Sequence, residues 1–242
     1  MAITFNSCSD DDDNDDTGNP TKLVKSIKDG DITTFEYDSQ NRVSKSIWDK
    51  GGTGSSSGSS YVTSTFVYEN NKIIVTKKNV LDPSDTDVMT LYLNDGYLTK
   101  MKESDYYETY TYSNGYLSTI VYSDDDYTES FIWENGNITR IVGIWENGTA
   151  EWTYEYGDIA NNLNVDSYIL AEYFPKMKGT RSKNFPISCR SIYRSYGSIT
   201  DDDTYSYSYT LDADGYPTKI IETRDDNLYG SRDVETTTIT YY

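Results

Sequence analysis

The stretch "TYTYSNGYLSTIVYS", from Thr109 to Ser123, alternates aromatic or aliphatic residues with polar ones on both sides of an Asn-Gly pair. An alternation with a period of two places successive side chains on opposite faces of a β-strand. Asn-Gly between two such runs is the strongest short-range hairpin signal, because a type I′ turn needs positive φ at both central residues. The stretch therefore predicts a β-hairpin with the pairs Ser113–Tyr116, Tyr112–Leu117 and Tyr110–Thr119.

Six further stretches repeat this pattern. In all of them an aromatic residue or Leu precedes the turn, and an aliphatic residue, Ala or Pro follows it on the same face. Two copies, "TFEYDSQNRVSK" and "YTLDADGYPTK", carry one extra residue, which a three-residue loop with Asn41 or Gly215 in the left-handed region absorbs. The predicted pairs are Leu93–Leu98, Trp133–Ile138, Trp145–Ala150, Tyr68–Ile73, Tyr37–Val43 and Leu211–Pro217.

At the next same-face pair of residues away from each turn, uninterrupted strand pairing predicts a basic residue opposite an apolar one. The pairs are Phe35–Lys45, Leu91–Lys100, Phe131–Arg140 and Tyr209–Lys219. Repeated cations would each cost roughly 2–4 kcal/mol on the lipid-facing side of a barrel near the bilayer midplane, so the pattern argues against a membrane-spanning barrel. The opposite face is polar beside the turns and becomes apolar at Met101, Ile120, Ile141 and Ile220. Either the second face is covered only toward one end, or a β-bulge shifts the alternation.

The hairpins combine into an all-β fold. Gly96, Gly115 and Gly136 are spaced about 20 residues apart, and the whole chain offers roughly 13 to 15 strands of ordinary length. Because an open sheet of that width would present two long edges, we predict an antiparallel up-and-down meander curled into a barrel or half-barrel. The alternative is a two-sheet sandwich. Residues 21–242 are expected to form a single domain.

Residues 158–186 abandon the alternation. Val165, Ile169, Leu170, Tyr173 and Phe174 fall on one helical face, which predicts a short helix near residues 165–175. Such a helix would bury its apolar stripe in the mouth or the interior of the barrel.

The composition excludes several mechanisms. The chain of 242 residues has no histidine, so a Ser-His-Asp triad and a His-ligated zinc site are unavailable. A net charge of −19 opposes nucleic-acid binding. The only two cysteines could form a Cys8–Cys189 disulfide, but we expect Cys189 to be a buried free thiol. No cofactor is expected.

The opening, "MAITFNSCSDDDDNDDTGNPTK", has the pattern of a bacterial lipoprotein cleavage site, with a small residue before Cys8 and polar chain after it. It resembles the Ser-plus-acidic signal of surface-exported lipoproteins of the Bacteroidetes. Cys8 would then be the lipid anchor and residues 1–20 a signal remnant with a disordered acidic tether, which places the protein at the outer membrane or cell surface, with the periplasmic face as a variant. Only seven residues precede Cys8, with no basic region and no full apolar region, so we expect the start to be truncated. The alternative is an acidic tail with an incidental cysteine.

Several motifs together are similar to an uncharacterised lipoprotein family of the Bacteroidetes that is described as having a porin-like β fold. They are "YTYSNGYLSTI", "YTLDADGYPTKI", "NNLNVDSYILAEYF" and "GTRSKNFPIS". The resemblance covers residues 21–242 and implies a barrel shape rather than a channel. A weaker resemblance is to the tyrosine-aspartate repeats of large secreted shell proteins.

Two sets of residues are candidate binding sites. The first combines an apolar cleft with the one concentrated basic patch, and its alternative is a solvated loop: Tyr173, Phe174, Lys176, Lys178, Arg181 and Lys183. The second is a sugar-stacking platform of Trp133, Trp145 and Trp152, whose alternative is packing at cross-strand positions. Three acidic runs, Asp82–Asp87, Asp124–Asp126 and Asp201–Asp203, could hold calcium but lack the order of a known calcium loop, so no metal site is predicted.

The sequence favours a cell-surface lipoprotein that acts as a non-catalytic binding module for a hydrophobic or amphipathic ligand such as a lipid. The first alternative is a carbohydrate-binding or adhesive surface protein, and the second is a carboxylate-based hydrolase. We expect a monomer that contacts the membrane through its acyl anchor only and does not bind nucleic acid.

Overall fold

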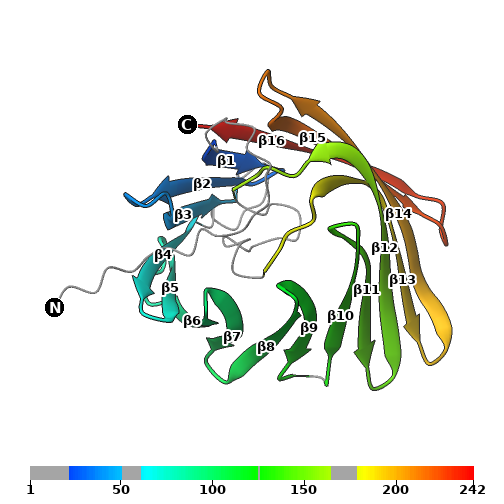
Figure 1. Ribbon diagram of the computed structural model, residues 1–242, viewed down its shortest axis with the longest axis horizontal. Coiled ribbons are helices and arrows are strands. Elements are labelled where there is room, and N and C mark those ends of the chain that lie inside the picture. The colour runs from blue at the N-terminus through cyan, green and yellow to red at the C-terminus, as the bar shows by residue number, and fades with distance from the viewer. Residues whose placement is uncertain (1–21, 51–60, 125, 165–178) are drawn as a thin grey trace.

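The computed structural model describes residues 22–50, 61–124, 126–164 and 179–242, and these form one closed antiparallel barrel of sixteen strands (Figure 1). Every strand pairs with its neighbours in sequence, and the first strand pairs with the last. The strands are β1 (Val24–Lys28), β2 (Ile32–Tyr37), β3 (Val43–Asp49), β4 (Tyr61–Glu69), β5 (Lys72–Asn79), β6 (Thr86–Asn94), β7 (Tyr97–Glu103), β8 (Tyr106–Ser113), β9 (Tyr116–Tyr122), β10 (Thr128–Glu134), β11 (Asn137–Trp145), β12 (Gly148–Ala160), β13 (Asn184–Ser195), β14 (Ser198–Leu211), β15 (Pro217–Asp226) and β16 (Arg232–Tyr241).

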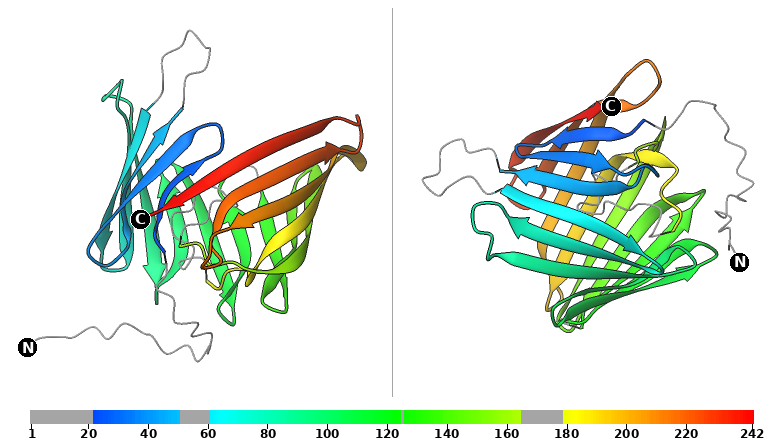
Figure 2. Two further views of the ribbon diagram at one scale, coloured as in Figure 1. Left: turned by 90° about the horizontal axis from the view of Figure 1, so that it is seen from above. Right: turned by 90° about the vertical axis from the view of Figure 1, so that its left-hand side faces the viewer.

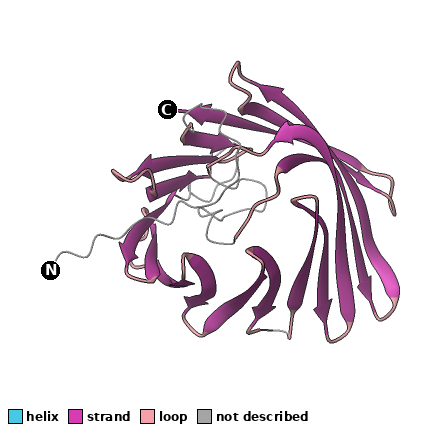
Figure 3. Cartoon of the chain, in the orientation of Figure 1, coloured by secondary structure: helices cyan, strands magenta, loops and turns pink. Residues whose placement is uncertain are grey.

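The predicted meander is confirmed, and it closes fully rather than forming a half-barrel or a sandwich. Closure removes the two sheet edges that would otherwise be free to pair with other chains. Two further views show β1 beside β16 (Figure 2). The described chain consists of strands and loops (Figure 3), and the helix expected near residues 165–175 lies outside the described residues. No helix among the described residues has the length and apolar character needed to span a membrane.

Six of the seven predicted turns form at the expected residues. Asn114 and Gly115 have φ of 53° and 80°, and the same left-handed pair recurs at Asp95-Gly96 and Asn135-Gly136. Asn41 and Gly215 occupy the left-handed region in the two longer loops. Six of the seven predicted pairs beside the turns are therefore confirmed: Tyr112–Leu117, Leu93–Leu98, Trp133–Ile138, Tyr68–Ile73, Tyr37–Val43 and Leu211–Pro217.

The predicted Trp145–Ala150 pair is wrong. Trp145 pairs with Gly148, and Ala150 pairs with Gly143, so the turn consists of Glu146 and Asn147. The indole of Trp145 lies over Gly148, where a Cβ atom would come within 2.4 Å of the ring. Gly148 therefore provides the space in which the indole ring packs, and it is not the second turn residue.

The pairs predicted one step further from the turns are also wrong, because a β-bulge adds one residue to the second strand of these hairpins. Phe35 pairs with Ser46, Leu91 with Met101, Phe131 with Ile141, Tyr209 with Ile220, and Tyr110 with Ile120. The bulge thus explains why the alternation of polar and apolar residues in the sequence shifts by one position a few residues after these turns. It moves Lys45, Lys100, Arg140 and Lys219 to the outer face.

The extra residue of each of these bulges is Ser or Thr. In four of them its hydroxyl donates to a carbonyl oxygen of the partner strand, as Ser118 Oγ does to Thr111 at 3.1 Å. The other three donors are Thr99, Thr139 and Thr218. This local bond stabilises the bulge where the strand ladder is interrupted.

A ring of aromatic side chains completes the bulges around the barrel. In each of these bulges, one residue directly precedes the extra residue. Its carbonyl oxygen accepts a hydrogen bond from an aromatic side chain of the next strand, at 2.6–2.8 Å. We call these donors the aromatic ring: Tyr37, Tyr68, Tyr112, Trp133, Tyr156, Tyr209 and Tyr241. The β4–β5 hairpin has no bulge, and the corresponding residue of the following strand is Leu93, which has no polar group to donate. The donors therefore occur where the ladder leaves a carbonyl without its usual partner.

The inner face of the barrel changes character along the strands. We call the end with the turns at Asn70-Asn71, Asp95-Gly96, Asn114-Gly115 and Asn135-Gly136 the packed end, because the buried apolar core fills the barrel there. Members of this core include Phe35, Phe66, Ile73, Leu91, Leu98, Leu117, Leu163, Phe185 and Ile220. The opposite end is called the acidic end.

Described residues of the β12–β13 connection cross the packed end. Leu163 is buried in the core, and Asn164 accepts a hydrogen bond from the Val24 amide at 2.8 Å. On the other side, the Thr180 and Lys183 amides donate to the carbonyl oxygens of Gly115 and Gly136. The packed end is thus tied together from β1 to the β10–β11 turn.

Candidate functional site

The candidate site is the inner face at the acidic end. Counting inward-facing positions away from the packed end, β5, β7, β8, β10 and β15 each carry two apolar or aromatic residues and then a charged one. These charged residues are Lys77, Glu103, Glu108, Glu129 and Glu222. We call the region beyond this level the acidic chamber.

Strand register places ten acidic residues and two basic ones of the described strands on the inner face. The acidic residues are Asp87, Glu103, Glu108, Glu129, Asp201, Asp203, Glu222, Asp226, Asp233 and Glu235, and the basic ones are Lys77 and Arg224. Asp233 and Glu235 are exposed although they face inward, so water reaches this part of the interior. The chamber therefore presents a negative potential to solvent.

Two glutamates of the chamber are held by tyrosines. Glu108 accepts hydrogen bonds from Tyr106, at 2.6 Å, and from Tyr110. Glu129 accepts bonds from Tyr122 and Tyr127, at 3.1 and 2.8 Å. Burial, followed by the charge of Glu129, raises the pKa of Tyr122 and of Tyr127 above the usual range, so both hydroxyls stay protonated donors.

Aromatic rings line the same wall. Tyr127 lies 4.9 Å from Tyr122 and 5.9 Å from Trp145 between ring centroids. Further along the wall, Trp152 meets Tyr193 edge to face at 5.5 Å. Offset and edge-to-face contacts at these separations are favourable.

A glycine makes room for this aromatic row. A Cβ atom on Gly143 would lie 2.4 Å from the Tyr127 hydroxyl, so only glycine allows the ring to cross β11 at this point. Gly143 is also the register partner of Glu129, the carboxylate that Tyr127 binds. The close approach therefore positions the hydroxyl for its bond.

An ion pair lies on the opposite wall of the chamber. Arg224 Nη2 is 2.7 Å from Asp203 Oδ2, and the Asp203 side chain is only 2% exposed. The hydrogen bond with Asp203 raises the pKa of Arg224 above its usual range. Asp203 Oδ1 and Arg224 Nε are buried and have no hydrogen-bond partner in the part of the chain that the structure describes. The pair is therefore incompletely satisfied, which is unusual for buried polar groups.

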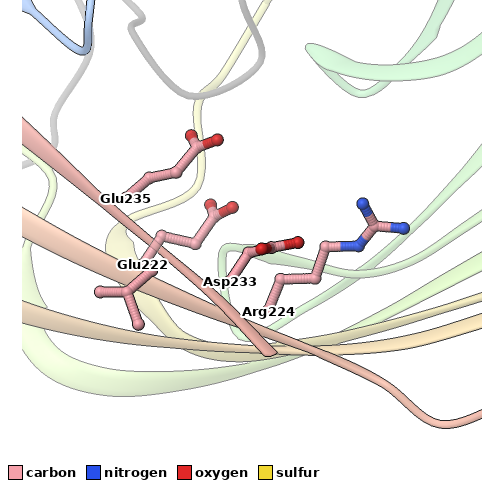
Figure 4. Close-up of a pocket in the computed structure, with 5 residues that line it drawn as sticks. Glu222, Arg224, Asp233 and Glu235 are labelled. Atoms are coloured by element: carbon pink, nitrogen blue, oxygen red, sulfur yellow. The ribbon is translucent and has the colours of Figure 1, made fainter. Parts of the chain in front are cut away.

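A cavity of about 220 Å³ adjoins this ion pair (Figure 4). Its lining residues are Glu222, Arg224, Asp233, Val234 and Glu235. Figure 4 shows the four labelled charged side chains projecting from the same face of β15 and β16. Glu222 pairs directly with Glu235, and Arg224 with Asp233.

The outer face of the barrel has a different arrangement of charge. Lys45 pairs with Glu36 at 2.9 Å, and Arg232 pairs with Asp225 at 2.6 Å. Among the described residues, basic side chains are thus scarce on the inner face and lie on the outer face opposite their own acidic partners.

The structure separates the residues that the sequence singled out as a ligand site. Tyr173, Phe174, Lys176 and Lys178 lie outside the described residues, as does the expected anchor Cys8. Arg181 lies at the packed end, where it donates to the carbonyl oxygens of Leu163 and Asn161. Lys183 is exposed at the same end. Arg181 and Lys183 therefore lie away from the acidic chamber, and the role of the whole set in ligand binding stays a prediction.

The three tryptophans face the interior. Trp133 belongs to the aromatic ring and donates to Leu117 at 2.8 Å, while Trp145 and Trp152 line the acidic chamber. All three are partly exposed. Stacking on a sugar stays a prediction for Trp145 and Trp152.

Strand alternation separates one of the acidic runs. Asp201 and Asp203 face inward, whereas Asp202 faces outward and binds Arg190 through both oxygens, at 3.0 and 2.8 Å. In the part of the chain that the structure describes, no group of three acidic residues or cysteines has a metal-binding arrangement. Cys189 is buried and free, as expected.

The chamber carboxylates were missed in the sequence, although a signal was present. In "YYETY" a glutamate stands two residues from tyrosines on both sides, and "DDDTYSYSY" continues a tyrosine face into Asp203 and Asp201. A charged residue that lies an even number of positions from the core residues of its strand is on the same side of the strand as they are. The alternation could therefore have placed Glu108 and Asp203 inside the barrel.

With this geometry established, comparison with known proteins gives the family. Residues 35–219 match the family described as "Domain of unknown function (DUF4595) with porin-like fold". The chain belongs to this family. A comparison with curated proteins finds no match.

Two solved structures show the same fold. A porin-like protein from Bacteroides uniformis is 20% identical, with a TM-score of 0.69, over 92% of this chain and 99% of that one. A porin-like protein from Bacteroides vulgatus is 12% identical, with a TM-score of 0.61, over 91% and 99%. At these identities the likeness establishes the fold alone.

Proposed function

We propose that this member of the DUF4595 family is a non-catalytic binding protein of the cell surface or outer membrane. In this proposal the acidic chamber receives an amphipathic ligand that carries a positive charge. The observation that carries the proposal is the asymmetry of the barrel interior, which is packed at one end and lined with carboxylates and aromatic rings at the other. Aromatic faces and carboxylates together suit an organic cation, because both attract positive charge.

Several features support binding over transport through the barrel. Core side chains fill the packed end, and the described residues of the β12–β13 connection lie across it. Ion pairs such as Arg140–Glu151, at 2.8 Å, stand on the outer face. Because charged residues facing lipid would each cost about 2–4 kcal/mol at the midplane, the outer face suits water.

Binding also fits the chamber better than hydrolysis does. Glu108 and Glu129 each accept bonds from two tyrosine hydroxyls. Glu222 and Glu235 are neighbours in one sheet rather than groups that face each other across a cleft. A glycosidase needs one carboxylic acid and one carboxylate on opposite sides of the bond that breaks.

Cys8 is the proposed anchor. The neighbouring structures come from Bacteroides, which supports a surface or outer-membrane location. Lys22 lies at the packed end, where it pairs with Asp212 and Asp214 of the β14–β15 turn at 2.7 and 2.5 Å. The described chain therefore begins at the packed end, on the side of the barrel opposite the acidic chamber. A Cys8→Ser variant should move from the membrane fraction to the soluble fraction of the cell.

Ligand titration tests the proposed binding function. We expect organic cations to quench tryptophan fluorescence and raise the melting temperature, with an effect that weakens at high salt. Trp152→Phe should weaken the response, whereas Trp133→Phe, at the packed end of β10, should not. Binding of phospholipid vesicles alone would replace the proposed ligand by the lipid expected from the sequence.

Carbohydrate binding is the second candidate, favoured by the ring row that includes Trp145. A neutral oligosaccharide would stack on these rings and hydrogen-bond to the carboxylates, with little dependence on salt. Salt dependence therefore separates the two candidates.

A further inference from the structure

Three aromatic side chains meet on one wall of the acidic chamber, where β9 and β11 end. Tyr122 lies 4.9 Å from Tyr127, and Tyr127 lies 5.9 Å from Trp145, between ring centroids. The ring planes are inclined by 39° and 58°, so neither pair is stacked flat. All three side chains are partly exposed, and each therefore keeps ring surface that a ligand can reach. We call them the aromatic triad.

Local contacts fix the position of the triad. The Tyr122 amide donates to the Tyr127 carbonyl oxygen at 3.0 Å, and the Tyr127 hydroxyl donates to Glu129 at 2.8 Å. Gly143 leaves the space into which the Tyr127 ring packs. A ligand would therefore meet rings that are already oriented, and this reduces the entropy lost on binding.

Half-buried carboxylates supply negative charge beside the triad. Glu129 accepts hydrogen bonds from Tyr122 and Tyr127, and Glu108 is the register partner of Tyr122. Burial raises the pKa of Tyr122, and the charges of Glu129 and then Glu108 raise it further, which means that both carboxylates act on the same ring. A cation on the triad would thus be attracted by two negative charges as well as by the ring faces.

Among the described residues, basic side chains are absent from this wall. In the strands from β8 to β13, the register turns Arg140, Arg190 and Arg194 to the outer face, and no described inward-facing residue is basic. The two basic residues of the inner face lie on other strands, Lys77 on β5 and Arg224 on β15. The protein therefore places no cation of its own over the triad in the part of the chain that the structure describes.

The hydrogen bonds of the carboxylates indicate which kind of cation fits. Every oxygen of Glu108 and Glu129 already accepts a bond from a tyrosine hydroxyl. A primary ammonium is strongly hydrated and brings three N–H donors, which need acceptors in place of the water that they lose. A methylated ammonium brings fewer donors or none, and ring faces attract its charge without hydrogen bonds. The wall therefore favours a methylated cation.

We propose that the aromatic triad is the subsite for a methylated or quaternary ammonium group, with Tyr127 and Trp145 contributing ring faces and Glu129 the negative charge. This inference rests on the proposed function, since the apolar remainder of the ligand would extend along the chamber wall toward Trp152 and Tyr193. It narrows the ligand from organic cations in general to compounds that carry a di- or trimethylammonium group.

Calorimetric titration of the full chain with choline tests the subsite. The neutral isostere 3,3-dimethylbutanol has the shape of choline without its charge, and we expect it to bind about tenfold more weakly or not at all. Methylammonium, which has the charge and three N–H donors, should bind more weakly than tetramethylammonium. Both comparisons use the wild type, so they do not depend on the folding of a variant.

Two variants test the residues. Trp145→Leu should raise the Kd for choline about fivefold or more, because it removes a ring face. Glu129→Gln should raise the Kd for choline and leave that for 3,3-dimethylbutanol nearly unchanged. The matched control is Glu134→Gln, which makes the same substitution at an exposed position of the same strand at the packed end and should leave both values unchanged.

The contrary outcomes are separable. Tighter binding of methylammonium than of tetramethylammonium would overturn the assignment to a methylated group and keep the cation-binding chamber. Loss of choline binding in Trp152→Phe but not in Trp145→Leu would reject the triad as the subsite and keep the proposed function. Equal binding of choline and 3,3-dimethylbutanol would overturn both the subsite and the cationic class of the ligand. Failure of every organic cation to bind would reject both proposals.

Discussion

The Tyr112 hydroxyl donates a hydrogen bond to the Leu98 carbonyl oxygen at 2.7 Å, across the junction between two hairpins. Leu98 precedes Thr99, the extra residue of the β7 bulge, so its carbonyl has lost its regular place in the ladder. The same relationship recurs around the barrel in the aromatic ring. Each bulge that faces the aromatic ring is therefore closed by a side chain of the following strand, which couples neighbouring hairpins to one another.

Replacing Tyr112 by Phe should lower the free energy of unfolding by about 1–2 kcal/mol. The change keeps the ring contact with Tyr97 and leaves the Leu98 carbonyl without its donor. Urea denaturation measures the difference. Tyr92→Phe, at an outward-facing tyrosine that is 40% exposed, is the control and should shift the stability by less than about 0.5 kcal/mol. Equal stability of the two variants would contradict a stabilising role of the bond.

Gly143→Ala should destabilise the barrel by about 1–3 kcal/mol, because the new methyl group would overlap the Tyr127 hydroxyl. The displaced ring would also lose its bond to Glu129 and its contact with Trp145, which near-ultraviolet circular dichroism reports. A double-mutant cycle with Tyr127→Ala checks the cause. If Gly143→Ala costs as much in the Tyr127→Ala background as in the wild type, the overlap is not the reason.

Asp203→Asn should cost about 1–3 kcal/mol, because it leaves the Arg224 charge beside a buried wall without its counter-ion. The value stays below that of a fully buried pair, since the Arg224 side chain is 41% exposed and can rehydrate. Asp225→Asn is a close control, because its ion pair with Arg232 lies on the outer face and should contribute less than about 1 kcal/mol. Thermal denaturation of both variants gives the comparison, and a larger loss in Asp225→Asn would refute the argument.

Stability should fall steeply in alkali. Burial raises the pKa of Tyr37, Tyr205 and Cys189 to about 12, whereas the unfolded chain titrates tyrosine near 10 and cysteine near 8.5. The unfolded state then loses protons first, so the folded state loses stability as pH rises from about 9 to 12. Absorbance of the tyrosinate group should rise cooperatively with the loss of β-structure signal in circular dichroism. Gradual, non-cooperative ionisation of the tyrosines in an intact barrel would contradict this coupling.

The hairpins could be predicted from the sequence because their causes are local. Positive φ at Asn114 and Gly115 is a property of those two residues, and it determines the pair Tyr112–Leu117 directly. The wrong prediction of the Trp145 pair has a local explanation as well. Gly148 can be a turn residue or can make room for an aromatic ring, and the sequence does not distinguish these two roles. The all-β class and the free, buried Cys189 could also be predicted from the sequence.

Tertiary structure alone decided the bulges, the closure and the orientation of the two faces. A bulge is stabilised partly by a hydroxyl group from another hairpin, as the Tyr112 hydroxyl stabilises the bulge beside Leu98. The sequence of one hairpin therefore does not contain both partners of this bond. Alternation assigned Glu108 to the tyrosine face and Thr109 to the opposite face, but it did not show that the tyrosine faces of all the hairpins enclose one interior. Pairing of β1 with β16 settled that question, because closing the sheet gives it an interior and brings Glu222, Glu235 and Glu129 into one chamber. Hydrogen bonding within four residues determined the turns, and hydrogen bonding across the whole chain determined the site.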